Sequence, residues 1–404
     1  MKLPIYLDHH ATTPIDPRVL AEMMPFFKEE FGNPASRNHV FGRRASEAVE
    51  TARRGIAKAV HALDEAEIIF TSGATESNNL AIKGAAAVYK ERGNHIITSV
   101  IEHKSVLESC EQLGKEGFRV TVLPVDRNGF IRLDELKAAI TDQTILISIM
   151  HANNEIGTLQ PIEAIGKIAK SNGIFFHCDA VQSVGKVPVD VQAMGIDLMS
   201  FSAHKLYGPK GIAALYVRKR NPRVRLAPLF GGGGQEGGLR PGTLNVPAIV
   251  GFARAVQIAV REMPEESERL FLLREKLRKQ ICGALHRAYV NGGLDHRLPG
   301  NLNMSFAFVE GELLLTELAE EIAVSSGSAC THASLEPSYV LKALGVGHGL
   351  EHTSIRFGLG RFNTEEEINH AALCVIKTVN RLRKQSPLYK TVAAKENSPS
   401  GASR

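Results

Sequence analysis

The segment from residue 65 to 220 alternates short apolar runs with longer stretches of helical periodicity, and this alternation restricts the possible folds more than any other feature. The candidate strands are 67–71, 95–100, 119–124, 144–150, 174–178, 198–202 and 212–217. Most of them lack polar alternation, as expected for strands that helices cover on both faces. Intervening stretches such as 74–90 and 161–171 repeat apolar residues at helical spacing. The pattern predicts an α/β domain with a largely parallel sheet.

The remainder of the chain predicts a second, smaller domain. A chain of 404 residues is too long for one average domain. The helical stretch 246–285 contains Pro264 in an acidic run, so we expect one helix to end there, another to begin, and a domain boundary to lie nearby.

Three segments beyond this proline are predicted to be strands of a smaller α+β domain. These segments are 302–306, 322–325 and 354–357. The last residues are rich in Ser, Pro and Gly, which is typical of disorder. We therefore predict a large domain over 15–259, a small domain over 1–14 and 260–390, and a disordered tail over 391–404.

Composition and charge restrict the environment of the protein. The formal charge of +5 is mild for this length and does not imply nucleic acid. No apolar stretch approaches the roughly 18 residues of a membrane span, and the N-terminus has no apolar signal core. The five cysteines are scattered without a CxxC pair, which indicates neither a disulfide framework nor a zinc ribbon. We expect a reduced protein in the cytoplasm.

Two of the predicted strands lead to residues of opposite charge. Lys205 follows the run 198–202, and Asp179 follows the run 174–178. A lysine can form a Schiff base with the aldehyde of pyridoxal phosphate (PLP), and a carboxylate can keep the pyridine nitrogen protonated. A surface lysine after a strand is the alternative interpretation, so the neighbouring segments must decide.

A candidate phosphate site follows the first predicted strand. Residues 70–78 read FTSGATESN, a strand end, a turn of small residues and a helix start. Thr75 and the amides beside it could bind a phosphate at the helix N-terminus, although an ordinary N-cap would have the same sequence. Ser202 and His204 lie next to Lys205 and favour the phosphate interpretation.

His103 and Asn154 follow two further strands. The carboxyl edge of an open α/β sheet is where ligands bind, so both residues are candidates for the site. The imidazole of His103 could stack on a cofactor ring and exchange protons, although a lone histidine is more often structural. The pair Asn153 and Asn154 could bind an anion or simply form a turn.

Three other segments are not predicted to form cofactor or metal sites. Strand alternation places Cys178 on the opposite face from its two polar neighbours, so we expect a core cysteine and no metal ligand set. The glycine-rich run 231–238 lacks the Gly-Lys-Ser/Thr ending of a P-loop, which indicates a flexible or closely packed loop. The basic run 218–225 is interpreted as a solvated loop, with a docking surface as the alternative.

Cys330 lies in SSGSACTHAS at 325–334, a run of small residues after a predicted strand. Structural cysteines usually lie among apolar side chains, so this context indicates a reactive thiol. A mobile loop would carry a thiolate between an active site and an outside acceptor. Arg356 lies on a later strand, where it could bind a substrate carboxylate or form a structural salt bridge.

Taken together, these motifs resemble the cysteine desulfurases of the NifS/IscS group, within the fold type I (class V aminotransferase) family of PLP enzymes. The resemblance extends over nearly the whole chain, and its strongest pieces are YLDHHATTP at 6–14, TSGATESN at 71–78, SAHK at 202–205 and SSGSAC at 325–330. It implies a large domain with a mainly parallel seven-stranded sheet, a smaller α+β domain that carries the catalytic cysteine loop, and a homodimer with active sites near the subunit interface.

The resemblance also implies a role for each candidate residue. Lys205 would hold PLP, Asp179 would pair with the pyridine nitrogen, Gln182 would bond the phenolic oxygen, and His103 would stack on the ring and take part in catalysis. The phosphate would be held by Ala74, Thr75, Ser202 and His204, with Thr243 from the other subunit. Asn154, beside the cofactor, and Arg356 would hold the substrate carboxylate.

The implied reaction converts L-cysteine to L-alanine and a persulfide on Cys330, with Lys205 moving the Cα proton. The sulfur would pass to an iron–sulfur scaffold protein or to another acceptor such as a tRNA thiolation system. No intrinsic metal is expected, although the persulfide could contact a nascent iron–sulfur cluster. Three features depart from the family pattern: the tail after Leu388, the residue His332, and the extra glycine in 231–234. These departures leave the identity of the sulfur acceptor open.

Two other kinds of protein remain as alternatives. A PLP-dependent aminotransferase or a selenocysteine lyase of the same fold would need Lys205 and Asp179 but would have no use for the Cys330 loop. A non-catalytic sulfur carrier would display Cys330 without any need for the lysine and the aspartate.

Overall fold

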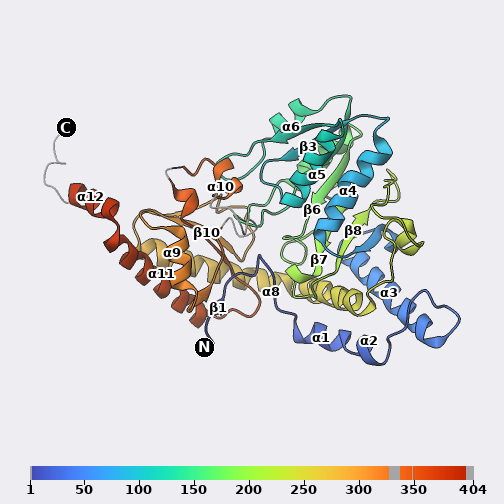
Figure 1. Cartoon of the computed structure of the whole chain (residues 1–404), viewed down its shortest axis with the longest axis horizontal. Helices are drawn as coiled ribbons and strands as arrows, with labels where there is room; N and C mark the ends of the chain where they lie inside the picture. Colours follow the sequence, from blue (N-terminus) through green and yellow to red (C-terminus); the bar gives the residue numbers. More distant parts are fainter. Residues whose placement is uncertain (1, 327–336, 348, 397–404) are drawn as a thin grey trace. The chain divides into compact units, whose positions relative to one another are not determined.

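The computed structural model describes residues 2–326, 337–347 and 349–396, with labelled elements as in Figure 1. Cys330 and His332 therefore lie outside the described residues. The chain divides into two compact units. The large unit comprises Thr12–Asn154 and Thr158–Ser267, and the small unit comprises Met1–Ala11, Glu155–Gly157 and Glu268–Arg404.

A seven-stranded sheet forms the centre of the large unit, as the alternating pattern predicts. The strands are β2 (Ile68–Thr71), β3 (His95–Ser99), β4 (Arg119–Leu123), β5 (Thr144–Ser148), β6 (Phe175–Asp179), β7 (Leu198–Ser202) and β8 (Ala213–Val217). Their order is β2-β8-β7-β6-β5-β3-β4. Strand β8 is antiparallel to both of its neighbours, and all other pairs are parallel.

Except at the edge strand β4, the strands of this sheet are buried on both faces, which explains their largely apolar runs in the sequence. Consecutive side chains of a strand belong to different cores: Phe175 belongs to the cluster on one face, with Leu80 and Val106, and Phe176 belongs to the cluster on the opposite face. The helices of the large unit are α1 (Pro17–Met23), α2 (Pro25–Lys28), α3 (Val40–Ala59), α4 (Ala74–Tyr89), α5 (Lys104–Lys115), α6 (Leu133–Ala139) and α7 (Ile162–Ser171). Short 3-10 helices are η1 (Glu65–Glu67), η2 (Ala203–Lys205) and η3 (Gln235–Gly238).

The direction of the strands brings the candidate site residues to one edge of the sheet. Strands β3, β5, β6 and β7 are parallel, and β2 runs in the same direction because two antiparallel pairings separate it from β7. The carboxyl ends of these strands therefore lie at the same edge, which is where open α/β sheets bind their ligands.

The small unit contains two further sheets. Strands β9 (Ala288–Val290), β10 (Asn301–Phe306) and β12 (Ser354–Gly358) form an antiparallel sheet in the order β12-β10-β9, and β1 (Ile5–Tyr6) pairs in parallel with β11 (Ile322–Ala323). The strands predicted at 302–306, 322–325 and 354–357 are confirmed, whereas β1 and β9 were not predicted. The helices are α9 (Gly311–Leu318), α10 (Tyr339–Ala343), the 3-10 helix η4 (Leu350–His352), α11 (Glu365–Gln385) and α12 (Pro387–Glu396).

The expected helix break at Pro264 is wrong. A single helix, α8 (Val246–Ala284), runs through this proline. The Pro264 ring is exposed, so solvent can hydrogen-bond the carbonyl that a proline leaves without its helical donor. Towards the end of the chain, α12 covers residues 391–396 of the segment predicted to be disordered, and residues 397–404 lie outside the described part.

Candidate active site

The carboxylate of Asp179 is held in a fixed orientation at the end of β6. The side chain is buried, and its Oδ1 accepts a hydrogen bond from the Val181 backbone N–H at 3.0 Å. Its Oδ2 accepts a second bond from the Asn78 side-chain amide at 2.8 Å. Asn78 lies in the second turn of α4, so the helix after β2 positions the acid after β6.

A chain of hydrogen bonds connects Asp179 to His103. The Asn78 amide that donates to Asp179 also donates to the Ser105 hydroxyl at 2.9 Å. The Ser105 hydroxyl lies 2.8 Å from Nδ1 of His103, and the Ser105 backbone N–H donates to the same nitrogen at 3.2 Å. Because Nδ1 accepts a backbone N–H, the proton of the neutral imidazole lies on Nε2.

The charges of Asp179 and Lys205 both act on His103. Burial lowers the pKa of His103 and is the largest cause of the shift; the charge of Asp179 opposes it and the charge of Lys205 adds to it. His103 is the N-cap of α5, and Lys205 ends η2 directly after β7. The structure therefore brings together the lysine, the acid and the imidazole that the sequence placed at separate strand ends.

The N-terminus of α4 is open to an anion. Its N-cap is Gly73, which supplies no capping side chain, and a Cβ built on Gly73 would meet nothing within 4 Å. Ala74 and Thr75 are the first residues of this helix, so their amides lie where an α-helix lacks backbone acceptors.

Ser202 and His204 lie on either side of the turn that leads to Lys205. The buried Ser202 hydroxyl donates to the Ile212 carbonyl at 3.4 Å. Nδ1 of His204 lies 3.1 Å from the Thr12 hydroxyl. Burial and then the charge of Lys205 lower the pKa of His204 to about 4, so this imidazole is neutral at neutral pH.

The remaining candidates of the large unit have more varied surroundings. The side-chain oxygen of Gln182 accepts a hydrogen bond from Lys186 Nζ at 3.1 Å. The Asn153 side chain donates to the Ile101 carbonyl at 2.9 Å, which ties the segment after β5 to the segment after β3, and Asn154 follows it. Thr243 lines a cavity of about 980 Å³ whose lining includes none of the other candidate cofactor residues.

The glycine-rich loop is anchored by an acid that the sequence did not single out. Glu236 is buried, and its two carboxylate oxygens bond the Arg53 guanidinium at 2.7 and 2.8 Å. One of these oxygens also accepts the Phe70 backbone N–H at 2.7 Å. The loop 231–238 is therefore tied to β2, which leads to the N-terminus of α4.

In the small unit, Arg356 of β12 forms a buried ion pair. Its Nη2 donates to Asp8 at 2.8 Å, and the Ser325 hydroxyl donates to the other oxygen of Asp8 at 2.7 Å. The backbone N–H of Arg356 donates to the Ser325 carbonyl at 2.7 Å. The salt bridge considered as an alternative for Arg356 is thus present.

Two sequence interpretations near the sheet have clear outcomes. Cys178 is fully buried in the core, as predicted, while His177 lies between the hydroxyls of Ser148 and Ser200. The description of 218–225 as a solvated run is wrong for Arg218. This arginine is buried and pairs with Asp197 at 3.0 Å. Its guanidinium also donates to backbone carbonyls such as that of Ile196, and these contacts together compensate for the burial of its charge.

Three supporting residues were missed by the sequence analysis. Asn78 and Ser105 orient the groups at the strand ends, and the fully buried Glu102 accepts bonds from Ser99 Oγ at 2.6 Å and the Met150 N–H at 2.9 Å. Burial raises the pKa of Glu102 to about 8. Their positions in the sequence were the available signal: Asn78 lies in the second turn of α4, among small and polar residues, and Glu102 precedes His103 at a strand end.

The chain belongs to the aminotransferase class-V family, which matches residues 5–370. It is 57% identical to the cysteine desulfurase IscS of Anaeromyxobacter sp. (strain Fw109-5), over 97% of this chain and 96% of the relative. It is 54% identical to the cysteine desulfurase IscS of Rickettsia conorii (strain ATCC VR-613 / Malish 7), over 96% of this chain and 94% of the relative.

Solved structures agree with these relatives. A NifS-like protein superposes with a TM-score of 0.87 at 40% identity, covering 94% of this chain and all of that one. The NifS-like protein from Rickettsia africae ESF-5 gives a TM-score of 0.82 at 33% identity, covering 93% and 99%. The predicted fold class and the predicted membership of the cysteine desulfurases of the NifS/IscS group are confirmed, and this group is PLP-dependent. Among the described residues, no helix is long and apolar enough to cross a membrane.

Proposed function

We propose that this cysteine desulfurase binds PLP on Lys205 and transfers the sulfur of L-cysteine to Cys330, releasing L-alanine. The observation that carries this proposal is the convergence of Lys205, Asp179 and His103 at one sheet edge, where the charges of the first two act on the third. Asp179, held by two hydrogen-bond donors, could pair with the pyridinium nitrogen of PLP, and Lys205 could react with its aldehyde.

The phosphate of PLP fits the open N-terminus of α4. Gly73 leaves space in front of the first amides of the helix, at Ala74 and Thr75, and a helix N-terminus favours negative charge. Ser202 and His204 would add side-chain contacts. Thr243 lines a separate cavity, which supports the expectation that it serves the second subunit.

Bound PLP would supply an electron sink, and this chain's own residues would handle protons and orientation. Lys205 would remove the substrate Cα proton and return it. His103 would stay neutral, because burial lowers its pKa, and would present the proton of Nε2 to the reacting groups. Asp179 would pair with the pyridine nitrogen, with Asn78 preventing its rotation, and Gln182 would contact the phenolic oxygen.

The sulfur step needs the thiolate of Cys330, which lies outside the described residues. This thiolate would attack the substrate sulfur, forming an S–S bond while the substrate C–S bond breaks. The electron pair of the broken bond would stay on Cβ, which is then protonated, so that L-alanine and a persulfide on Cys330 result. Asn154 and Arg356 would hold the substrate carboxylate during this step.

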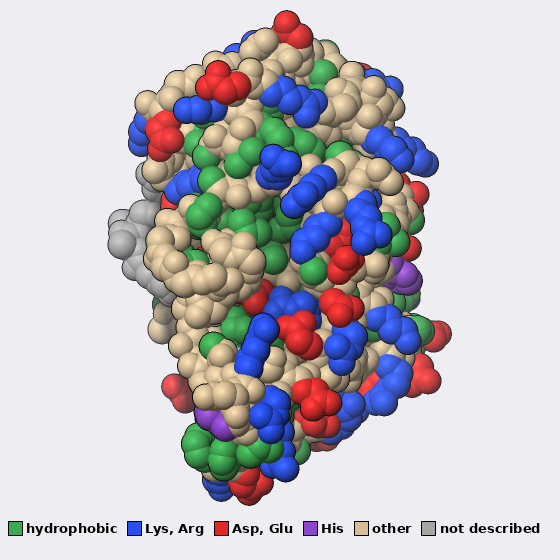
Figure 2. Space-filling view, turned by 90° about the vertical axis from the view of Figure 1, so that its right-hand side faces the viewer, with side chains coloured by type: hydrophobic (Ala, Val, Ile, Leu, Met, Phe, Trp, Pro, Cys, Tyr) green, Lys and Arg blue, Asp and Glu red, His purple; other side chains and the backbone are tan. Residues whose placement is uncertain are grey.

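A homodimer is part of the proposal. Several large apolar side chains of the large unit are exposed, among them Phe31 (66%) and Phe41 (43%), whose rings stack at 5.5 Å. Figure 2 shows a further group of hydrophobic side chains gathered in a hollow and bordered by lysines and arginines. Apolar patches of this kind mark protein–protein contacts.

The persulfide on Cys330 would then be passed to an iron–sulfur scaffold protein or to a tRNA thiolation acceptor, in the cytoplasm.

Product analysis tests the proposal. The purified protein should turn over L-cysteine to equal amounts of alanine and sulfide in the presence of a reductant. Cys330→Ser should abolish sulfide release while L-cysteine still changes the PLP absorbance. Full turnover by Cys330→Ser, with L-selenocysteine as the better substrate, would favour a selenocysteine lyase. Amino-group transfer to a keto acid would favour an aminotransferase.

A further inference from the structure

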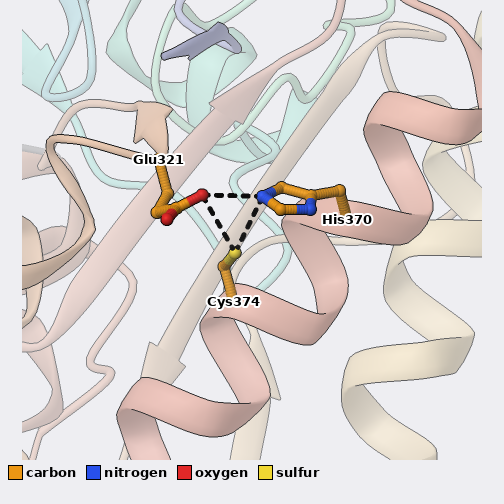
Figure 3. A group of neighbouring side chains, drawn as sticks. All are labelled: Glu321, His370 and Cys374. Atoms are coloured by element: carbon orange, nitrogen blue, oxygen red, sulfur yellow. Dashed lines mark hydrogen bonds and ion pairs between the residues drawn. The ribbon is translucent and has the colours of Figure 1, made fainter. Parts of the chain in front are cut away.

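Three side chains of the small unit converge on one point of its surface (Figure 3). Nε2 of His370 lies 2.7 Å from a carboxylate oxygen of Glu321 and 3.3 Å from Sγ of Cys374. The sulfur lies 3.9 Å from the same carboxylate oxygen. None of the three residues takes part in the proposed desulfurase chemistry.

The local structure fixes this convergence. His370 and Cys374 are four residues apart on α11, so they lie on the same face of the helix one turn apart. The rotation of the helix is set by buried neighbours such as Ala371 and Val375. Glu321 directly precedes β11, and its backbone is held by a bond from its N–H to the Leu318 carbonyl and by one from the Ile5 N–H to its own carbonyl.

The arrangement differs from a catalytic Cys-His-acid triad. In such a triad the thiol and the acid bind opposite nitrogens of the imidazole, so that the ring passes a proton between them. Here the sulfur and the carboxylate both approach Nε2.

We propose that Glu321, His370 and Cys374 bind a divalent ion of the zinc class, with a water molecule in the fourth position. A thiolate, an imidazole and a carboxylate form a borderline-soft ligand set that suits Zn²⁺. In a tetrahedral zinc site, ligand atoms at the usual bond lengths lie about 3.4 to 3.6 Å apart. The three observed separations of 2.7, 3.3 and 3.9 Å bracket this range, so side-chain rotations that shift these atoms by less than about 1 Å would admit the ion.

The exposure of the cluster suits an ion that exchanges with solvent. The side chains of His370 and Glu321 are 31% and 44% exposed, which gives an entry path and room for water. A surface ion pair would account for His370 and Glu321 alone, but it would not account for the sulfur beside the same nitrogen. An ion bound here would link β11 to α11, two elements that are far apart in the sequence.

Cobalt(II) titration tests this site directly. The experiment uses the chelator-treated, PLP-loaded protein in a Cys330→Ser background, so that the loop cysteine cannot bind the metal. We expect one equivalent of cobalt to give the intense visible d–d bands of a tetrahedral, thiolate-bound ion. Zinc should displace these bands and raise the melting temperature, because the ion binds only the folded state.

Three single variants and one matched control decide the outcome. Cys374→Ser, His370→Gln and Glu321→Gln should each weaken cobalt binding by at least about tenfold, since removal of a ligand costs no less than loss of a residue that orients one. Cys282→Ser changes an exposed cysteine on α8 and should bind cobalt like the background protein. The PLP absorbance and the melting temperature in chelator should be the same for all variants, which excludes unfolding. Equal binding in the three cluster variants and the control, or bands that lack a thiolate signature, would overturn the proposal.

Discussion

The side-chain amide of Asn78 donates a hydrogen bond to the carboxylate of Asp179 across 2.8 Å, between two residues 101 positions apart in the chain. Its second amide hydrogen goes to Ser105, whose hydroxyl contacts His103. One asparagine on α4 therefore sets the orientation of both the acid and the imidazole proposed to contact the cofactor ring.

Replacement of Asn78 by alanine should weaken PLP binding by about 10- to 100-fold, because a hydrogen bond to a charged group is lost in a buried site. Asn78→Asp should be worse, since it places a second negative charge beside Asp179. Titration of the apoprotein with PLP, followed by absorbance, measures both effects. Asn172→Ala, at an exposed end of α7, is the matched control and should bind PLP normally. Normal PLP affinity in both Asn78 variants would contradict the role of this residue.

Arg356 offers a test that separates substrate binding from structure. Arg356→Lys should raise KM for L-cysteine by about 10- to 100-fold, because an ammonium group cannot replace the two-pronged guanidinium contact with a carboxylate. Asp8→Asn removes the ion pair of Arg356 but leaves the guanidinium in place. It should lower the melting temperature with a much smaller change in KM. If Arg356→Lys has the same KM as the unaltered protein, Arg356 does not bind the substrate carboxylate and has only the structural role of its ion pair with Asp8.

The pH dependence of stability should reveal the buried acid Glu102. Its pKa is raised from 4.5 to about 8 by burial, so the folded state keeps a proton that the unfolded state loses. Stability is therefore lost as pH rises between these values, by at most about 1.4 kcal/mol per pH unit for this group. Glu102→Gln stays neutral at all pH values and can still accept from Ser99 and Met150. Urea unfolding from pH 5 to 8 should show the variant gaining stability relative to the unaltered protein as pH rises. A difference that does not change with pH would contradict the protonated state of Glu102.

The pair Arg53 and Glu236 should be essential to the stability of the large unit. Glu236→Ala leaves a buried guanidinium without its partner and the Phe70 N–H without its acceptor. Loss of one member of a buried ion pair costs about 3 to 5 kcal/mol of the free energy of unfolding. The matched control is Glu111→Ala, which breaks an exposed pair with Lys115 and should change stability very little. Similar midpoints of urea unfolding for the two variants would show that the buried pair contributes no more than the exposed one.

The sheet of the large unit could be predicted from the sequence because its strands, except the edge strand β4, are buried on both faces. Runs such as 198–202 are buried throughout and carry no charged residue, and their spacing leaves room for crossover helices. The ends of these strands then marked Asp179 and Lys205 as site candidates without any knowledge of side-chain contacts. The short strands β1 and β9 carry no such pattern, because two or three residues are too few to show a period.

Other features could not be predicted because they depend on tertiary contacts. Pro264 ends no helix, since its exposed position allows α8 to continue. Arg218 and Glu236 lie in polar, loop-like sequence, yet each is buried by a partner distant in the chain. The role of Asn78 needs the relative positions of α4 and β6. The convergence of Glu321 with His370 and Cys374 needs the placement of α11 beside the residue that precedes β11. Local sequence shows where such groups lie along the chain, but not what they face.

The central claim is that Cys330 receives the sulfur of the substrate, and a single turnover tests it most directly. The PLP-loaded protein should be mixed with one equivalent of L-cysteine in the absence of reductant, quenched, and examined by peptide mass spectrometry and by alanine analysis. We predict one alanine per PLP and the mass of one added sulfur atom on the peptide that contains Cys330, with neither product in Lys205→Ala. Alanine formed without added sulfur on that peptide, or added sulfur on another cysteine in its place, would contradict the account.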